Sequence, residues 1–413
     1  MPSWTAQADG TAHKPAPGVY LEFSVRERAA GFRTGRPIFI GRPHAIPKPE
    51  PEPEPEPDAG VQIRRLSEWG DFARLVGEPS AGGSFLASAV RGFFENGGEQ
   101  CVVATCSVDQ WPALLDDDSR DRASKLSEID DVDLVCAPDL VRETADQHVA
   151  LQRQILAHCD RLRDRFAILD APPDAKSRDA AFHWHQLVSP NGALYFPWLL
   201  PLRRPGEEAH ADGDARWVPP CGHVAGIFAR TDRRSGVHKA PANELLEGVA
   251  DIRVHVSDEE QSVLNNVGVN CLRALPGRGV RIWGARTLSG QAEWRYVNVR
   301  RLFITIRRWL ETECRDLVFD SNHTQLWNRI RDRLTNYCYA LYQSGALKGE
   351  TPAEAYYVKC DAETNPADER AVGRVTAEIG LAATKPAEFI VVRITQEAAS
   401  GSTEEISTIS ERS

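Results

Sequence analysis

Long apolar stretches are absent from this sequence of 413 residues. No run of about 18 apolar residues occurs, which is the length that a membrane-spanning helix needs, so we expect no membrane span and no membrane partner. The first residues, MPSWTAQADG, lack the basic start and apolar core of a signal peptide. We therefore expect synthesis in the cytoplasm.

Cysteine pairs and excess positive charge are lacking too. The nine cysteines are an odd number with no CxxC pair, which favours reduced thiols that serve as small core residues. A formal net charge of −10 argues against a general nucleic-acid binder. Hydrophobic residues make up 42% of the chain, so it can bury a sizeable core.

Motifs of common catalytic sites are also missing. Neither GxGxxG nor GxxxxGK[ST] follows any predicted strand, and no serine lies in a GxSxG elbow. His183 and His185 would lie on one side of an extended segment, but no third ligand is indicated nearby. A structural or surface role for this pair is favoured over a metal site, and we expect no cofactor.

Two patterns stand out in the N-terminal part. Residues 18–26 alternate between Val19, Leu21, Phe23 and Val25 on one face and Tyr20, Glu22, Ser24 and Arg26 on the other, which predicts a half-buried strand. A second short apolar run covers residues 36–40. The segment PEPEPEPEPD, Pro49–Asp58, predicts an extended polyproline II rod of roughly 30 Å, favoured as a solvated spacer over a recognition motif.

From residue 61 the pattern alternates between strands and helices. Ser84 is a candidate cap for a helix that ends at Asn96, and strands are expected at residues 101–106, 132–137 and 167–169. The helix between the last two contains Leu151, Ile155 and Cys159 at helical spacing. Units of about 30 residues of this kind predict parallel strands with helical crossovers, hence a mixed α/β core.

Asp109, Asp139 and Asp170 each follow one of these strands. Strand ends of α/β sheets are where ligands bind, so a carboxylate cluster there could hold Mg²⁺ in a metal-dependent hydrolase. The competing interpretation, that aspartates cap helices and satisfy turn amides, is favoured. The enzyme is kept as the alternative function.

The second half contains two clear helices. One covers residues 298–314, and its four arginines Arg300, Arg301, Arg307 and Arg308 lie two turns apart as a basic stripe. Such a stripe would suit an acidic partner or be a solvated face. The second helix opens near Ser321 or Asn322 and ends at Gly345. Neither helix specifies chemistry.

The end of the chain predicts a buried strand followed by a polar tail. The strand covers Glu388–Thr395 and contains Phe389, Ile390, Val391, Val392 and Ile394, which are apolar on both faces. The tail, residues 398–413, is rich in Ser, Thr and Glu and is predicted to be disordered. A strand therefore lies near each end of the chain, to pair within its own subunit or with a neighbour's sheet.

Nine segments, in order along most of the chain, resemble contractile tail sheath proteins of phages and of extracellular contractile injection systems. They are PGVYLEF, AVRGFFENGG, VDLVCAPDL, AHCDRLRDRFAILDAPP, ALYFPWL, VPPCGHVAGIFARTDRRSGVHKAPANE, GVRIWGARTL, WRYVNVRRL and PAEFIVVRI. The compact length is closer to the injection-particle sheaths. The Pro-Glu segment departs from the resemblance and could mark a specialised paralogue.

The resemblance implies a structural subunit and no enzyme. Similar proteins stack as hexameric rings around an inner tube, between a baseplate and a terminal cap, and contract to drive the tube through an envelope. It implies that Val19–Arg26 and Glu388–Thr395 are arms that add strands to neighbouring subunits. On this model the four arginines are candidate contacts to the tube or to another sheath subunit.

The expected organisation follows. Residues 1–45 form an N-terminal arm, 46–60 a Pro-Glu linker, 61–200 an α/β domain, 201–387 a C-terminal domain, and 388–413 a strand arm with its tail.

Overall fold

The computed structural model describes residues 34–42, 61–76, 84–115, 126–202, 217–317, 320–371, 373–388, 395–397 and 403–405. The chain divides into two compact units, residues 1–33 and 34–413, and every described residue belongs to the second. The strand predicted at residues 18–26, the Pro-Glu segment and residues 389–394 lie outside the described residues.

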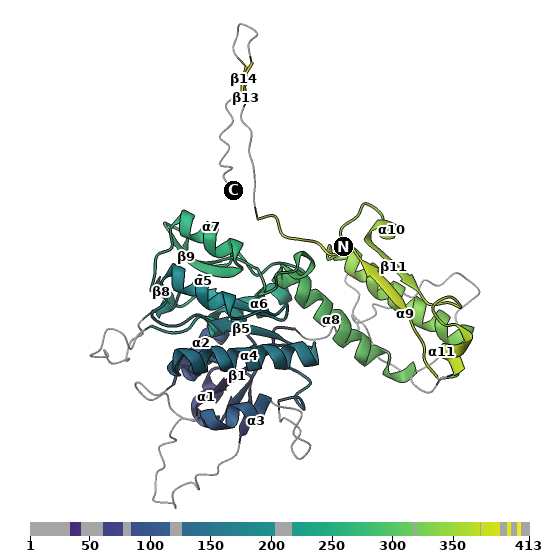
Figure 1. Cartoon of the computed structure of the whole chain (residues 1–413), viewed down its shortest axis with the longest axis horizontal. Coiled ribbons are helices and arrows are strands. Elements are labelled where there is room, and N and C mark those ends of the chain that lie inside the picture. Colours follow the sequence, from purple (N-terminus) through teal and green to yellow (C-terminus); the bar gives the residue numbers. More distant parts are fainter. Residues whose placement is uncertain are drawn as a thin grey trace, which may run out of the picture. The chain divides into compact units, whose positions relative to one another are not determined.

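A mixed sheet of eight strands is the centre of the second unit (Figure 1). Its order is β10-β9-β6-β5-β4-β1-β3-β2, in which β2 and β10 are antiparallel edges and the other neighbours pair in parallel. The strands are β1 (Pro37–Gly41), β2 (Gln62–Leu66), β3 (Cys101–Thr105), β4 (Leu134–Cys136), β5 (Phe166–Asp170), β6 (Gly192–Phe196), β9 (Val269–Leu275) and β10 (Gly279–Trp283). The predicted mixed α/β fold is confirmed.

Both faces of this sheet are buried, because successive side chains of a strand point to opposite faces. In β1, Ile38 and Ile40 belong to the core on one face and Phe39 to the core on the other. All five residues of β1 are buried. The strand therefore lies in the middle of the sheet, although its residues fall within the arm expected at 1–45.

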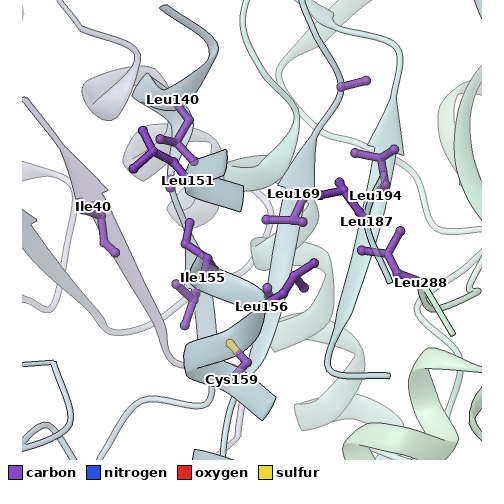
Figure 2. Packing of buried hydrophobic residues seen from close by; sticks show 14 of the residues in the cluster. Ile40, Leu140, Leu151, Ile155, Leu156, Cys159, Leu169, Leu187, Leu194 and Leu288 are labelled. Atoms are coloured by element: carbon purple, nitrogen blue, oxygen red, sulfur yellow. The ribbon is translucent and has the colours of Figure 1, made fainter. Parts of the chain in front are cut away.

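Helices cover each face. One face carries α3 (Trp111–Leu115), α4 (Ala145–Leu162), α5 (Ser177–His185) and α7 (Asp258–Asn266); the other carries α1 (Gly70–Leu75), α2 (Leu86–Glu95), α6 (Cys221–Ser235) and α8 (Val297–Glu313). Figure 2 shows the first core, where Ile155 and Leu156 of α4 pack near Leu169 and Leu194 of the sheet. The apolar spacing that predicted α4 is the spacing of the residues that it buries.

Helices α2 and α6 approach each other closely at glycines. A Cβ added to Gly222 would lie 2.1 Å from the Ala89 carbonyl oxygen, and one added to Gly226 would lie 2.5 Å from that of Phe93. Real Cβ atoms do not occupy such positions, so the side chain of any other residue would force the helices apart.

The residues after α8 form a smaller part of the same unit. Its elements are η5 (Arg315–Leu317), α9 (Thr324–Gln343), α10 (Pro352–Ala355), α11 (Ala367–Ala371) and the antiparallel pair β11 (Tyr356–Lys359) and β12 (Glu378–Leu381). Trp309 of α8 stacks on Tyr337 of α9, with ring centroids 3.7 Å apart. The two helices predicted in this half are confirmed.

Several short elements complete the described part. They are η1 (Val108–Gln110), η2 (Pro138–Arg142), η4 (Ala292–Trp294), and the antiparallel pairs β7 (Leu199–Pro201) with β8 (Val249–Ile252) and β13 (Thr395–Glu397) with β14 (Thr403–Glu405). Strand β14 lies in the tail that was expected to be disordered. The eight-stranded sheet takes strands from both expected domains, 61–200 and 201–387, so the expected boundary at residue 200 falls within one sheet.

The cysteines lie in the core, as the sequence analysis expected. None of the nine cysteines is in a disulfide, and all except the half-buried Cys314 are buried. Within the described ranges, no helix combines the length and the apolar character needed to cross a bilayer.

Three buried histidines predict acid sensitivity. Burial lowers the pKa of His148 to about 3, with a further contribution from His183, and lowers the pKa values of His183 and His223 to about 4. In the unfolded chain these histidines take up a proton at about pH 6.5. Their neutral forms therefore contribute fully to the free energy of unfolding above that pH, and this contribution is lost as the pH falls toward their pKa values in the folded chain. Between pH 6.5 and 5 each histidine should lower the free energy of unfolding by about 2 kcal/mol.

Thermal unfolding at pH 7 and pH 5 measures this effect. Asp170 offsets the loss of stability that one histidine causes at low pH. Its pKa is raised to about 7, so its protonation below that pH stabilises the folded chain. The variant His148→Leu should lose about a third of the histidine contribution to the pH slope. An equal slope in this variant and in the parent chain would contradict the assignment.

Candidate functional site

The three strand-end aspartates do not act as one site. Asp139, only 1% exposed, accepts hydrogen bonds from the Arg42 N–H at 2.8 Å, the Phe85 N–H at 2.6 Å and the Ser84 hydroxyl at 2.6 Å. It therefore joins the end of β1 to the start of α2. This is the structural role that the sequence favoured for it.

Asp170 has a similar task at the start of α6. Its Oδ1 accepts the Cys221 N–H at 2.8 Å, at a helix N-terminus where a carboxyl group is favourable. Burial raises its pKa to about 7, against the opposing effect of this hydrogen bond. Asp109 is exposed in η1. In the part of the chain that the structure describes, no three His, Cys, Asp or Glu side chains are grouped to hold a metal ion.

The His183/His185 pair lies in helix α5 and not in an extended segment. Residues two apart in a helix point in different directions, so the two imidazoles do not share a side. His183 is buried and its Nε2 lies 2.7 Å from Gln152 Oε1, whereas His185 is exposed. The structural role expected for the pair fits this environment.

The four arginines of α8 form no continuous exposed stripe. Arg301 and Arg308 are buried at 2% and 4% exposure, Arg300 is half-buried and Arg307 is exposed. Arg300 and Arg307 share one side of the helix, and Arg301 and Arg308 share another. The expectation of a single basic surface is therefore corrected, because two of the four side chains have partners inside the subunit.

Arg301 lies between two buried carboxylates. Its guanidinium contacts Asp232 of α6 at 2.6 Å and 2.8 Å and Asp133 at 3.0 Å, and it also lies over the Phe228 ring at 4.9 Å. Burial alone would lower the pKa of Arg301, but Asp232 and Asp133 together raise it. For Asp232 burial outweighs the arginine, and the pKa of that carboxyl is raised. The three side chains form one buried charge network.

Arg308 bonds to main-chain oxygens. It donates to the carbonyls of Val132 at 2.7 Å, Asp164 at 3.3 Å and Asp130. Burial lowers its pKa despite nearby carboxylates. Arg308 thereby connects α8 to the chain just before β4 and β5.

Arg300 and Arg307 face a surface hollow of about 470 Å³. Arg300 donates to Asn191 Oδ1 at 2.7 Å and lies over the Trp294 ring at 4.8 Å, whereas Arg307 forms an exposed ion pair with Glu311 at 2.7 Å. The lining residues are Asp160, Arg163, Pro190, Asn191, Trp294, Arg300, Phe303, Ile304 and Arg307. A contact of any of the α8 arginines with a tube or another sheath subunit stays a prediction.

The N-terminal end of the described core is held by the same charge network. Asp133 accepts the N–H groups of Gly35 at 3.0 Å and Arg36 at 2.7 Å, in addition to its contact with Arg301. Residues 34–36 lie directly after the unit formed by residues 1–33. The segment that leads to the predicted N-terminal arm is thus attached to α8 through one carboxylate.

The C-terminal end has a second charged attachment. Arg286 pairs with Glu388 through two bonds, Nε to Oε1 at 2.9 Å and Nη2 to Oε2 at 2.5 Å, and the Tyr296 hydroxyl lies 3.4 Å from Oε2. The hydrogen bond to Glu388 raises the pKa of Arg286. Asn298 in the first turn of α8 also donates to the Thr384 carbonyl at 3.3 Å. Residues 384–388, which lead into the predicted C-terminal arm and include its first residue, Glu388, are therefore held beside the start of α8.

Sequence reasoning missed these attachments. Asp133, Arg286 and Glu388 lie within the segments VDLVCAPDL, GVRIWGARTL and PAEFIVVRI, so the resemblance pointed to the right regions. Single charged residues in such segments carry no sign that they meet a partner more than 90 positions away. The arm residues themselves, Val19 to Val25 and Phe389 to Ile394, lie outside the described residues.

Family models match most of the described chain. The model described as the phage tail sheath protein central domain matches residues 117–288, and the phage tail sheath C-terminal domain matches residues 289–397. The two matches adjoin and together span more than half of the sequence.

Curated relatives carry the same description. A tail sheath protein of Salmonella phage ViI is 26% identical over an alignment of 255 residues, and the match covers 55% of this chain and 38% of the relative. A tail sheath protein of Vibrio phage KVP40 is 25% identical over 43% of this chain and 26% of its own length. A putative prophage major tail sheath protein of Pseudomonas aeruginosa is 27% identical over 43% of this chain and 46% of its own length. The chain spans less than half the length of each of these relatives.

Solved sheath structures match almost the whole chain. The helical sheath of the anti-feeding prophage in its contracted state has a TM-score of 0.71 and 29% identity, with 93% of this chain and all of that chain covered. The contracted sheath complex of the extracellular contractile injection system PVC has a TM-score of 0.69 and 28% identity over 94% of this chain and all of that chain. A chain of the anti-feeding prophage baseplate matches with a TM-score of 0.71.

These matches decide between the two functions weighed from the sequence. The aspartates that suggested a metal-dependent hydrolase hold main-chain amides or lie exposed, and the matched families and structures are sheath proteins. The chain belongs to the phage tail sheath family and is a contractile sheath subunit, a structural protein and not an enzyme.

Proposed function

We propose that this subunit polymerises as stacked hexameric rings around an inner tube and contracts to drive the tube through a target envelope. Its partners are further copies of itself or sheath paralogues, the tube protein, and the baseplate and cap proteins at the two ends. Assembly takes place in the cytoplasm, and the finished particle is a phage tail or tail-like injection particle. The observation that carries the proposal is the match over 93–94% of the chain to contracted sheaths.

Terminal strands would link the subunits. Main-chain hydrogen bonds contribute about 0.5–1.5 kcal/mol each, so two short strands added to neighbouring sheets would hold subunits together by several kcal/mol. These bonds are local to the added strands and do not depend on the tilt between subunit bodies. The attachments of Gly35 and Glu388 support this idea, because a linking arm needs a firm root in its own subunit.

Electron microscopy of the assembled particle tests the proposal. The high-speed pellet from cells that produce the chain together with its neighbouring particle proteins is imaged by negative stain, with the chain tracked by mass spectrometry. We expect the chain to pellet in striated rods of two lengths and two widths, which correspond to extended and contracted sheaths. A small soluble species, under lysis conditions that preserve such rods, would overturn the proposal.

The C-terminal attachment yields a specific prediction. In Glu388→Gln the charge-assisted pair with Arg286 is lost, although a neutral hydrogen bond remains possible. We expect rods from this variant to dissociate at a lower denaturant concentration than parent rods, while the isolated subunit changes by only about 1 kcal/mol. The matched control is Glu363→Gln, which removes an exposed ion pair with Lys359 away from both the attachment and α8. Equal loss of rod stability in both variants would contradict an anchoring role.

A further inference from the structure

The hollow beside α8 combines aromatic and cationic side chains. Trp294 and Phe303 pack edge to face with ring centroids 5.1 Å apart, and Arg300 lies over the Trp294 ring. The lining residues include three arginines, Arg163, Arg300 and Arg307, and only one carboxylate, Asp160. The hollow is therefore suited to a ligand that has flat apolar rings and negative charges close together.

Arg163 strengthens this interpretation through its backbone. It ends α4 in the left-handed region at φ 57°, a conformation that glycine adopts at lower cost. Its side chain is exposed and lines the hollow. An arginine at this strained position adds a third positive charge beside Arg300 and Arg307. Burial lowers the pKa of Arg300, and the nearby positive charges of Arg163 and Arg307 lower it further.

The sequence offers one segment with the matching chemistry. The Pro-Glu segment, Pro49–Asp58, contains five carboxylates that alternate with prolines. A polyproline II helix has three residues per turn and a rise of about 3.1 Å, so residues three apart share a face. Each face then alternates between a proline and an acid at about 9 Å spacing. Pro49, Glu52, Pro55 and Asp58 form one such face.

The described residues that flank this segment and the residues of the hollow lie at opposite ends of the parallel strands. Residues 43–60 connect the carboxyl end of β1 to β2, whose first residue pairs with Thr105 at the carboxyl end of β3. The hollow includes Asn191, which precedes β6, and Asp160 and Arg163, which precede β5, so it lies at the amino ends of the parallel strands. A binding segment that starts from one end of the strands and a receptor at the other end favour a head-to-tail contact between subunits. Repeated contacts of this kind generate a continuous polymer.

We propose that the hollow of one sheath subunit binds the Pro-Glu segment of a neighbouring subunit. This inference rests on the proposed polymer. The proline rings stack on Trp294 and Phe303, as in other recognition of polyproline II ligands, and the glutamates pair with Arg163, Arg300 and Arg307. The 18 residues from 43 to 60 are long enough to extend about 30 Å from the described core and back.

A binding experiment with a fluorescent peptide of residues 47–60 and the full-length chain tests the receptor. We expect saturable binding that weakens as salt rises. A peptide with glutamines in place of the acids, and one with alanines in place of the prolines, should each bind about tenfold more weakly, as should the parent peptide to Trp294→Ala or Arg300→Gln. Arg295→Gln, an exposed arginine outside the hollow, is the control and should bind normally.

Arg163→Gly separates binding from folding. Glycine relieves the left-handed backbone, so the melting temperature should stay the same or rise while peptide affinity falls. Equal affinity for the alanine-substituted peptide, or unchanged affinity in Arg163→Gly, Trp294→Ala and Arg300→Gln, would overturn the proposal.

A charge exchange tests the contact in the polymer. Replacing the acids at 50, 52, 54 and 56 by lysine, or Arg163, Arg300 and Arg307 by glutamate, should each reduce the fraction of chain in rods. Combining both sets should restore it. If the lysine variant, the glutamate variant and their combination all form rods equally well, this inference is overturned and the sheath function is unaffected. If the parent chain itself forms no rods, the sheath function is overturned. Loss of tube association in the arginine variant, without a change in rods, would assign the hollow to the tube instead.

Discussion

Replacing Arg301 with leucine is expected to lower the free energy of unfolding by about 3–5 kcal/mol. The change leaves Asp133 and Asp232, whose side chains are 5% and 3% exposed, without their shared cation. A buried carboxylate without a partner is costly, and leucine fills only part of the space of the guanidinium. Chemical denaturation of the isolated subunit, followed by tryptophan fluorescence, measures the loss.

The pH dependence of this loss identifies its cause. Burial raises the pKa of Asp232 even with Arg301 present, and without the arginine it should rise further. The folded variant then binds more protons than the unfolded chain, so its stability increases as the pH falls below the folded pKa toward about 4. The deficit relative to the parent chain should therefore be smaller at pH 5 than at pH 8. Arg307→Leu, on the exposed side of the same helix, should change stability by less than about 1 kcal/mol.

Replacing Gly222 with valine is expected to cost about 3 kcal/mol or prevent folding. The first atom of any side chain here would lie 2.1 Å from the Ala89 carbonyl oxygen and 2.4 Å from the Ala89 Cα, both main-chain atoms of α2 that cannot move alone. The gain in helix propensity over glycine, less than about 1 kcal/mol, is too small to compensate. Thermal unfolding and the yield of soluble chain are the measurements.

Gly290→Ala is the matched control for the glycine prediction. No atom lies within 4 Å of a Cβ built on Gly290, so alanine should be accepted there with little change in melting temperature. Equal stability of Gly222→Val and Gly290→Ala would show that α2 and α6 adjust more freely than close packing implies.

Local elements were predictable because their signals are local. Apolar spacing predicted α4, and an apolar stretch ended by Asn96 and two glycines predicted α2; the structure confirms both helices, although the N-cap of α2 is Phe85 and not the expected Ser84. The order of strands was not predictable in this way. Residues 37–41 do not themselves indicate that this short strand lies between β4 and β3, because its pairing is decided by contacts with segments 64 and 97 positions away.

The arginines of α8 show the same division. Helical periodicity correctly placed Arg301 and Arg308 together, two turns apart, but it cannot tell a solvated charge from a paired one. That difference depends on Asp133 and Asp232, which come from other parts of the chain and meet the helix only after folding. The resemblance identified the family from the sequence. The hydrogen bonds that hold residues 34–36 and 384–388 to the core could be recognised only in the folded structure.

The attachment of both ends of the core to α8 determines how force would travel through a subunit. Under strand exchange, tension on the N-terminal arm enters at Gly35 and passes through Asp133 to Arg301, in the second turn of α8. Tension on the C-terminal arm enters at Glu388 and passes through Arg286 and Tyr296 to the beginning of the same helix. The two loads meet within a few residues of each other. Side chains that end on α8 therefore carry part of each load past the sheet, while the main chain carries the rest of the N-terminal load from Arg36 directly into β1.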